Sequence, residues 1–158
     1  MEVAFLSSYD LVYLSQKAEE IGFVRDTLEK VYRLADILKF LNTVSLLRDS
    51  LALKGGTAIN LTIFNLPRLS VDIDLDYVVT NSKEDMLENR EKINAIIQRF
   101  MASSGYERSP KTKVPHSLDS WVYSYINAAG NRDNIKIEIN YSLRAHILPL
   151  EQRPIVTE

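Results

Sequence analysis

A short acidic segment of alternating residues constrains the fold of this chain more than any other part of the sequence. Residues 71–76 read Val-Asp-Ile-Asp-Leu-Asp, so acidic and branched apolar residues alternate strictly. Side chains alternate between the two faces of a β-strand. Asp72, Asp74 and Asp76 would therefore share one face, about 7 Å apart along the strand. We expect a strand from about Ser70 to Val79, with its apolar face against a core.

Carboxylates at this spacing repel one another unless a cation lies among them. Mg²⁺ suits such a site, because it prefers hard oxygen ligands and keeps open positions for substrate phosphates. A solvated surface face and a calcium-type structural site are the alternatives for an acidic cluster taken alone. Asp76 lies one pleat further along, where a structural pairing with Lys136 or Arg68 competes with a role in metal binding.

A glycine pair lies upstream of the acidic strand. Gly55 and Gly56 follow a short apolar strand at 51–53 and precede a helix that we expect at 57–65. Backbone N–H groups in such a turn and the dipole of the following helix favour an anionic phosphate. An ordinary turn, with Thr57 as a helix cap, is the alternative. Phosphates held beside a metal-binding strand indicate nucleotidyl transfer.

Five residues that precede the acidic strand are candidates for contact with the nucleotide. Gly55, Gly56 and Thr57 are the candidate backbone and hydroxyl contacts to phosphate. Lys54 and Arg68 are either partners of the triphosphate oxygens or ordinary solvated cations.

A second alternating segment comes near the end of the chain. The runs 118–127 and 134–142 predict a β-hairpin with a longer loop between its strands. In the second run, isoleucines alternate with Lys136 and Glu138, so these two charged residues share a face. If the two alternating strands are neighbours over one core, Glu138 comes beside Asp72 and Asp74. Lys136 would then contact phosphate or balance the acids.

The remaining segments predict helices and loops. Apolar periodicity indicates a long helix over about 26–48, and a shorter mixed helix is expected at 7–20. Ser82, with Asp85 three residues later, has the spacing of a helix cap, followed by an apolar stripe at Met86, Ile93, Ile97 and Phe100. We expect that helix to end before Gly105, and a loop over 107–117.

Two other features have ordinary explanations. His116 and His146 are the only histidines and lie in loop-like contexts, so a histidine metal site or a catalytic triad has little support. The aromatic residues of the hairpin are expected in the core rather than stacked on a nucleobase: Trp121, Tyr123 and Tyr125.

Composition bounds the class of protein. At 158 residues the chain is expected to form a single domain, and 46% hydrophobic residues give ample material for a core. The net charge of −2 provides no overall basic character for binding nucleic acid. There are no cysteines, which excludes disulfides and thiolate metal sites. Without a signal-like N-terminus or an apolar run of about 20 residues, a cytoplasmic protein with no membrane association is expected.

Together these motifs resemble a known family. The pattern Gly-Gly-Thr-Ala at 55–58, followed by Arg-x-Ser-x-Asp-Ile-Asp-Leu-Asp at 68–76, is similar to AbiEii-type nucleotidyltransferases, the toxins of AbiE (type IV) toxin–antitoxin systems. More broadly it resembles polymerase-β-like nucleotidyltransferases, with Gly56-Thr57 in place of the Gly-Ser of that superfamily. The resemblance covers roughly residues 28–142. It implies an α+β fold, with a small mixed or antiparallel sheet flanked by helices.

The resemblance also implies a mechanism and partners. Asp72 and Asp74 would bridge two Mg²⁺ ions, and Glu138, at the third-carboxylate position, would complete the metal site nearest the acceptor. The substrate would be an NTP, the acceptor plausibly tRNA, and the partner a cognate antitoxin protein. AbiEii relatives usually continue into a helical C-terminal region, which we expect to be absent here, leaving residues 1–158 as one catalytic domain.

Two alternative functions remain open at this point. One is the same chemistry with a small hydroxylated molecule as the acceptor. The other is a catalytically inactive module that keeps the fold for nucleotide binding or for contact with a partner.

Overall fold

A five-stranded mixed sheet forms one layer of the protein. A computed structural model describes residues 10–22, 24–54, 72–110 and 115–142. The spatial order of the strands is β1-β2-β5-β4-β3, and only the β2–β5 pair is parallel. The strands are β1 (Leu51–Lys54), β2 (Asp72–Tyr77), β3 (Glu107–Arg108), β4 (Leu118–Ile126) and β5 (Arg132–Asn140).

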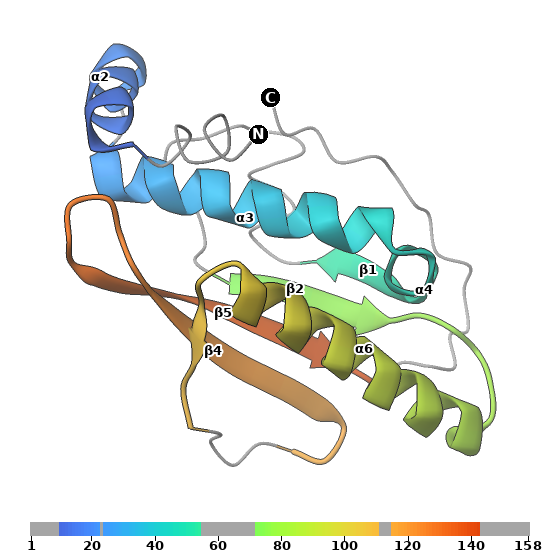
Figure 1. The fold of residues 1–158 in the computed structure, drawn as a ribbon. Coiled ribbons are helices and arrows are strands. Elements are labelled where there is room, and N and C mark those ends of the chain that lie inside the picture. The colour runs from blue at the N-terminus through green and yellow to red at the C-terminus, as the bar shows by residue number, and fades with distance from the viewer. Residues whose placement is uncertain (1–9, 23, 55–71, 111–114, 143–158) are drawn as a thin grey trace.

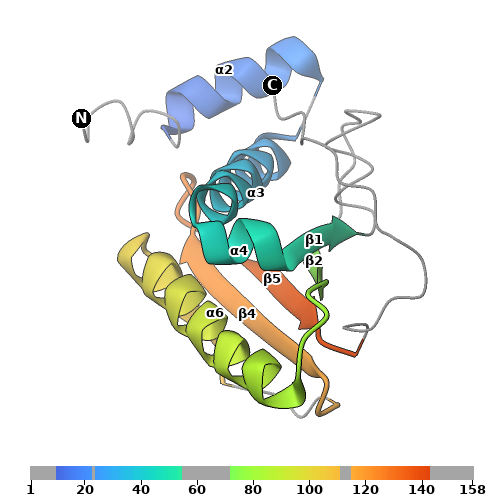
Figure 2. The same ribbon diagram turned by 90° about the vertical axis from the view of Figure 1, so that its right-hand side faces the viewer.

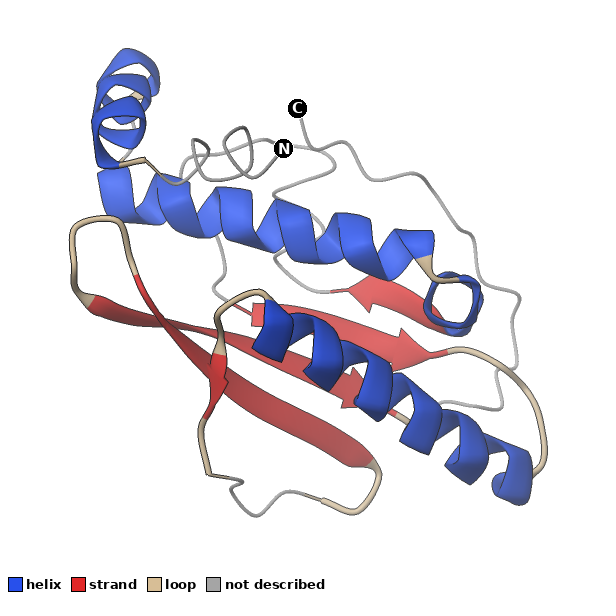
Figure 3. Ribbon diagram, in the orientation of Figure 1, coloured by secondary structure: helices blue, strands red, loops and turns tan. Residues whose placement is uncertain are grey.

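Helices cover one face of this sheet, as Figures 1 and 2 show. The helices on this face are α3 (Arg25–Thr43), α4 (Ser45–Ser50) and α6 (Lys83–Ser103), and α2 (Leu11–Ile21) lies on the outer side of α3. Helices α3, α4 and α6 share one core with the sheet, whereas α2 packs on α3 through a separate small cluster around Leu14 and Leu28. Figure 3 shows the resulting arrangement of helices over strands. The predicted α+β class with a small mixed sheet is confirmed.

Strand alternation produces the core. Ile73 and Leu75 of β2 are 0% and 3% exposed, and the isoleucines of β5 are equally buried. Each such side chain stabilises the fold by roughly 1.5–3 kcal/mol through loss of water contact. The helices supply the facing layer with these buried residues: Leu34, Ile37, Leu38 and Leu41 of α3, and Met86, Ile93, Ile97 and Met101 of α6. The alternation therefore leaves the acidic side chains on the sheet face opposite to this core.

The long helix predicted over 26–48 is two helices. Val44 has extended backbone angles, φ −97° and ψ 118°, between α3 and α4. The Thr43 hydroxyl donates a hydrogen bond of 2.7 Å to the Phe40 carbonyl, which satisfies an acceptor left open at the helix end. Two successive β-branched residues also lower helix propensity here. The break directs α4 straight into β1.

The predicted cap of α6 is confirmed. The Ser82 side chain accepts a hydrogen bond of 3.0 Å from the Asp85 backbone N–H, and the helix ends before Gly105, whose φ of 90° favours glycine. Phe100 is only partly buried against the core and stacks on Phe40, with ring centroids 3.9 Å apart. Met101, one position further, is the fully buried residue.

The hairpin is confirmed, with a shorter turn than the sequence suggests. Nine-residue strands β4 and β5 pair antiparallel from Leu118↔Asn140 to Ile126↔Arg132. The segment predicted as a loop over 107–117 begins instead with the short strand β3, whose Glu107 pairs with Ser124 of β4. The N-terminal helix begins at Leu11 with Asp10 as its cap. The helix expected at 57–65 lies outside the described residues.

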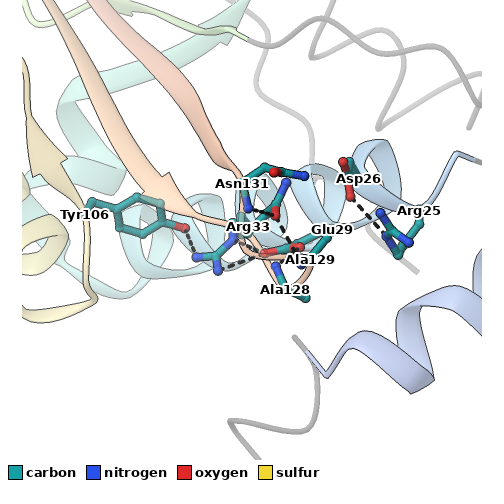
Figure 4. A network of polar contacts seen from close by, with 9 residues as sticks. Arg25, Asp26, Glu29, Arg33, Tyr106, Ala128, Ala129 and Asn131 are labelled. Atoms are coloured by element: carbon teal, nitrogen blue, oxygen red, sulfur yellow. Dashed lines mark hydrogen bonds and ion pairs between the residues drawn. The ribbon is translucent and has the colours of Figure 1, made fainter.

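A buried ionic network fastens α3 to the hairpin turn (Figure 4). The Glu29 carboxylate, 0% exposed, accepts 2.9 Å hydrogen bonds from the Arg33 guanidinium and from the Ala128 backbone N–H. Arg33 also donates to the Tyr106 hydroxyl at 3.1 Å and lies 4.1 Å from the centroid of the Tyr125 ring. Both charged groups in this network, Glu29 and Arg33, have partners within the fold, so its role is to hold the hairpin against α3.

Candidate metal and nucleotide site

The acidic strand has the two faces that its sequence predicts. On β2, Ile73 and Leu75 are buried in the core, while Asp74 and Asp76 are partly exposed on the opposite face. Asp72 begins the strand, and its side chain lies outside the described part of the structure. The carboxyl groups that the structure describes on β2 therefore project away from the helix layer.

Parallel pairing brings Glu138 of β5 next to this strand. Asp74 is the register partner of Glu138, and Asp72 is the partner of Lys136. Neighbouring strands lie about 4.7–4.9 Å apart, and residues in register project from the same face. The Asp74 carboxyl group lies close enough to Glu138 to help lower the pKa of Glu138. A divalent cation beside both carboxyl groups would offset the repulsion between them when both are ionised.

Two more donors converge on Glu138. Its Oε2 atom lies 3.0 Å from the Lys136 ammonium nitrogen and accepts a hydrogen bond of 3.3 Å from the Ser120 hydroxyl. Partial burial raises the pKa of the Glu138 carboxyl, but the contacts with Lys136, Ser120 and Asp74 outweigh burial and hold this pKa below its usual value. Glu138 is therefore ionised at neutral pH and is ready to act as an oxygen ligand.

Lys54 lies on the other side of Asp74. It is the register partner of Asp74 across the β1–β2 pair, and its ammonium nitrogen is 3.0 Å from Oδ1 of Asp76. The sequence suggested Lys136 or Arg68 as partners of Asp76. The ion pair that the structure describes for Asp76 is the one with Lys54, and the described ion pair of Lys136 is with Glu138. Arg68 lies outside the described residues.

The site thus forms one row across four strands. Lys54 of β1, Asp74 of β2, Glu138 of β5 and Ser120 of β4 are successive register partners. Carboxylates occupy the middle of the row, with a cation at one end and a hydroxyl at the other. The ammonium groups of Lys54 and Lys136 are the described cations beside the carboxylates, and their side chains are 44% and 37% exposed.

The carboxyl oxygens present suit a hard divalent cation. Oxygen ligands are those that Mg²⁺ prefers, and it accepts as few as one or two protein carboxylates. Within the described ranges no cluster of three or more His, Cys, Asp or Glu residues could hold a metal. Asp74 and Glu138 are the two predicted ligands whose side chains are described, and the role of Asp72 as the third stays a prediction.

The glycine turn falls outside the described residues. This applies to four of the predicted nucleotide contacts: Gly55, Gly56, Thr57 and Arg68. The described chain reaches this segment at Lys54, whose Cα is paired with that of Asp74. The contacts of Gly55, Gly56, Thr57 and Arg68 with phosphate therefore remain predictions.

The aromatic residues of β4 belong to the core, as expected. Trp121, Tyr123 and Tyr125 are 2–4% exposed and face the helix layer, so they present no ring to a nucleobase. His116 is exposed, and its backbone carbonyl accepts a hydrogen bond of 3.0 Å from Arg90. His146 lies outside the described residues.

Sequence reasoning missed Ser120. The serine is 8% exposed and contacts a carboxylate of the candidate site. Alternation along β4 could have indicated its face, because Ser120 and Val122 lie on the sheet face opposite to Trp121. Choosing Ser120 as the neighbour of Glu138 needs the register of the hairpin, which depends on the length of its turn.

A mixed sheet with helices on one face and paired carboxylates on the other has the form of a nucleotidyltransferase-like α+β domain. A comparison with protein families gives the particular family. The family model described as "Nucleotidyl transferase AbiEii toxin, Type IV TA system" matches residues 37–158. The chain therefore belongs to the AbiEii family of nucleotidyl transferase toxins, and the resemblance seen in the sequence is confirmed. A search of curated proteins finds no match.

No helix in the described part of the chain is long and apolar enough to cross a membrane.

Proposed function

We propose that this protein is a magnesium-dependent nucleotidyltransferase, which transfers a nucleoside monophosphate from an NTP to an acceptor. One observation carries the proposal. In a chain of this family, Asp74 and Glu138 lie in direct contact on adjacent strands. On this partly exposed face the described carboxyl groups of Asp74, Asp76 and Glu138 outnumber the lysines beside them, Lys54 and Lys136, so a divalent cation would offset the remaining negative charge.

Asp72, Asp74 and Glu138 would hold the metal. When bound, Mg²⁺ ions neutralise charge on the α-phosphate and lower the pKa of the acceptor hydroxyl. Asp74 and Glu138 contribute charge that is fixed before the substrates arrive, because both strands pack on a buried core. Glu138 is ionised at neutral pH and can also accept a hydrogen bond from the acceptor hydroxyl.

The nucleotide would be bound by the residues on the Lys54 side of the row and by Lys136. Lys54 and Lys136 each hold a carboxylate at 3.0 Å. Once a divalent cation neutralises the acidic cluster, their ammonium groups can turn toward the triphosphate. Gly55, Gly56 and Thr57 would supply backbone N–H and hydroxyl donors to the phosphates, and Arg68 a further cation.

The acceptor is plausibly tRNA, and a cognate antitoxin is the expected partner. Membership of a type IV toxin–antitoxin family supports the antitoxin, whereas the tRNA acceptor is what the resemblance in the sequence implies. Since NTPs and tRNA are available in the cytoplasm, the proposal places the reaction there.

The test incubates the protein with each α-labelled NTP, Mg²⁺ and total RNA. We expect one NTP to label an RNA of tRNA size, and Asp72→Ala to lose this transfer while Asp49→Ala keeps it. Asp49 is a matched control because it is a well-exposed aspartate of α4, outside the acidic cluster. Label in a small molecule would instead favour a small hydroxylated acceptor. NTP binding without release of pyrophosphate, under all conditions, would identify an inactive nucleotide-binding module and overturn the proposal.

A further inference from the structure

Ser120 has a position that the chemistry proposed above does not yet use. It lies on β4, directly across from Glu138 of β5, and its hydroxyl donates to Glu138 Oε2 at 3.3 Å. The serine is 8% exposed, so water has little access to the hydroxyl. A buried hydroxyl directed at one carboxylate oxygen restricts the rotation of that carboxylate.

Two donors reach the same oxygen from different strand positions. Lys136 approaches Oε2 from two residues earlier on β5, and Ser120 approaches it from the neighbouring strand. Lys136 has a long flexible side chain that is 37% exposed. Ser120 has a single side-chain rotor within a paired strand. The serine is therefore the donor that remains in place when the lysine turns toward a phosphate.

The strand position of Ser120 is itself fixed from the core side. Its neighbour Asp119, 4% exposed, faces the helix layer and accepts two hydrogen bonds from the Arg90 guanidinium of α6, at 2.9 and 2.8 Å. Asn94 of α6 donates a third, at 3.2 Å. Successive residues of β4 thus connect α6 on one face with Glu138 on the other, and this anchors the serine to the rigid part of the fold.

We propose that Ser120 is a positioning residue, which orients the Glu138 carboxylate for divalent-metal binding and for the acceptor. The inference rests on the proposed function, since it takes Glu138 as a metal ligand. Groups that hold a metal ligand in place typically affect metal affinity or activity by 10- to 100-fold when they are removed. For the loss of a single hydroxyl donor we expect the lower end, about tenfold.

The test measures Mn²⁺ binding to the full chain by isothermal titration, without nucleotide, together with the melting temperature. Ser120→Ala should weaken Mn²⁺ binding about tenfold with little change in melting temperature, and Ser120→Thr should restore binding because it keeps the hydroxyl. Ser124→Ala is the matched control. Ser124 is on the same strand and face and is also 8% exposed, but its hydroxyl bonds the Glu107 carbonyl and Arg132.

Different failures have different meanings. Wild-type affinity in Ser120→Ala overturns the positioning role, and so does an equal loss in Ser124→Ala, which would indicate general loosening of the sheet. If the wild type binds no Mn²⁺, or if Glu138→Gln binds as the wild type does, the proposed metal site itself fails. Comparing Ser120→Thr with Ser120→Val, which differ only in hydroxyl against methyl, keeps the test decisive if Ser120→Ala does not fold. Weaker Mn²⁺ binding in Ser120→Val alone supports the proposal.

Discussion

Two carboxylate clusters in this protein have opposite designs. Glu29 is fully buried, and its partners are a matched cation and a backbone N–H, both supplied by the fold. Asp74 and Glu138 are partly exposed and contact each other. The first cluster is closed, because its charge is already balanced within the core. The second belongs to an open face on which three described carboxyl groups, those of Asp74, Asp76 and Glu138, lie beside two lysines, and this excess of negative charge favours a cation from solution.

This difference predicts which changes affect function and which affect stability. A closed buried pair stabilises the fold only while both partners are present. An open cluster of like charges costs stability and is retained for binding. Mutations at the two clusters should therefore separate the two properties, and the following predictions test that separation in order of expected size.

The largest effect is expected for Asp74→Asn. Transfer should fall by at least about 1000-fold, which corresponds to about 4 kcal/mol in the activation barrier. The melting temperature should hold or rise, because an amide removes the repulsion and can donate a hydrogen bond to Glu138. Transfer rate and thermal unfolding measured on the same preparation check both parts. A melting temperature several degrees lower, with transfer retained, would assign Asp74 to the structure instead.

Glu29→Gln should have the opposite profile. It leaves the buried Arg33 guanidinium without its counter-charge, so the free energy of unfolding should fall by about 3 kcal/mol. Urea unfolding measures this loss, and transfer by the remaining folded protein should be unchanged. Glu88→Gln is the control: it also breaks an i,i+4 pair, with Lys92, but that pair is exposed on α6 and should contribute less than about 0.5 kcal/mol. Equal losses in the two variants would mean that burial does not distinguish them.

The two clusters differ in how well the sequence predicts them, because different patterns link the residues that meet in each. The Asp74–Glu138 contact was predictable, because both segments alternate with period two and both apolar faces needed the same core. The Glu29 network was not. Glu29 lies within a helical run, and its partner Ala128 is 99 residues away. Nothing in the local pattern states that the hairpin turn would rest on the first half of α3.

The Lys54–Asp76 pair shows the same limit within the site. Alternation correctly placed Asp76 on the acidic face, but the choice of its partner depends on the register between β1 and β2. That register places Lys54 opposite Asp74, within diagonal reach of Asp76. The two strands are separated by residues 55–71, and no turn signal of fixed length specifies their pairing. The break at Val44 was missed for a related reason, since apolar periodicity continues through it.

The smallest effect is expected for this Lys54–Asp76 pair, which shares one property with each of the two clusters. It is an ion pair like that of Glu29, but on the open face, and Lys54 is 44% exposed. Lys54→Met and Asp76→Asn should each change the free energy of unfolding by no more than about 1 kcal/mol. Their effects on NTP binding should differ. Lys54→Met should weaken it about tenfold, as expected for one charge-assisted contact with phosphate.

Asp76→Asn, in contrast, should leave NTP binding equal or tighter, because it frees the Lys54 ammonium from its carboxylate. Titration of a non-hydrolysable NTP in the presence of Mg²⁺ measures both variants against the wild type. Unchanged NTP affinity in Lys54→Met would show that the pair only fastens β1 to β2, as the Glu29 network fastens α3 to the hairpin. Nucleotide binding would then depend on Lys136 and the glycine turn. Weaker binding in both variants would instead mean that Asp76 is needed to hold Lys54 in position, so that a single ion pair serves the structure and the site at once.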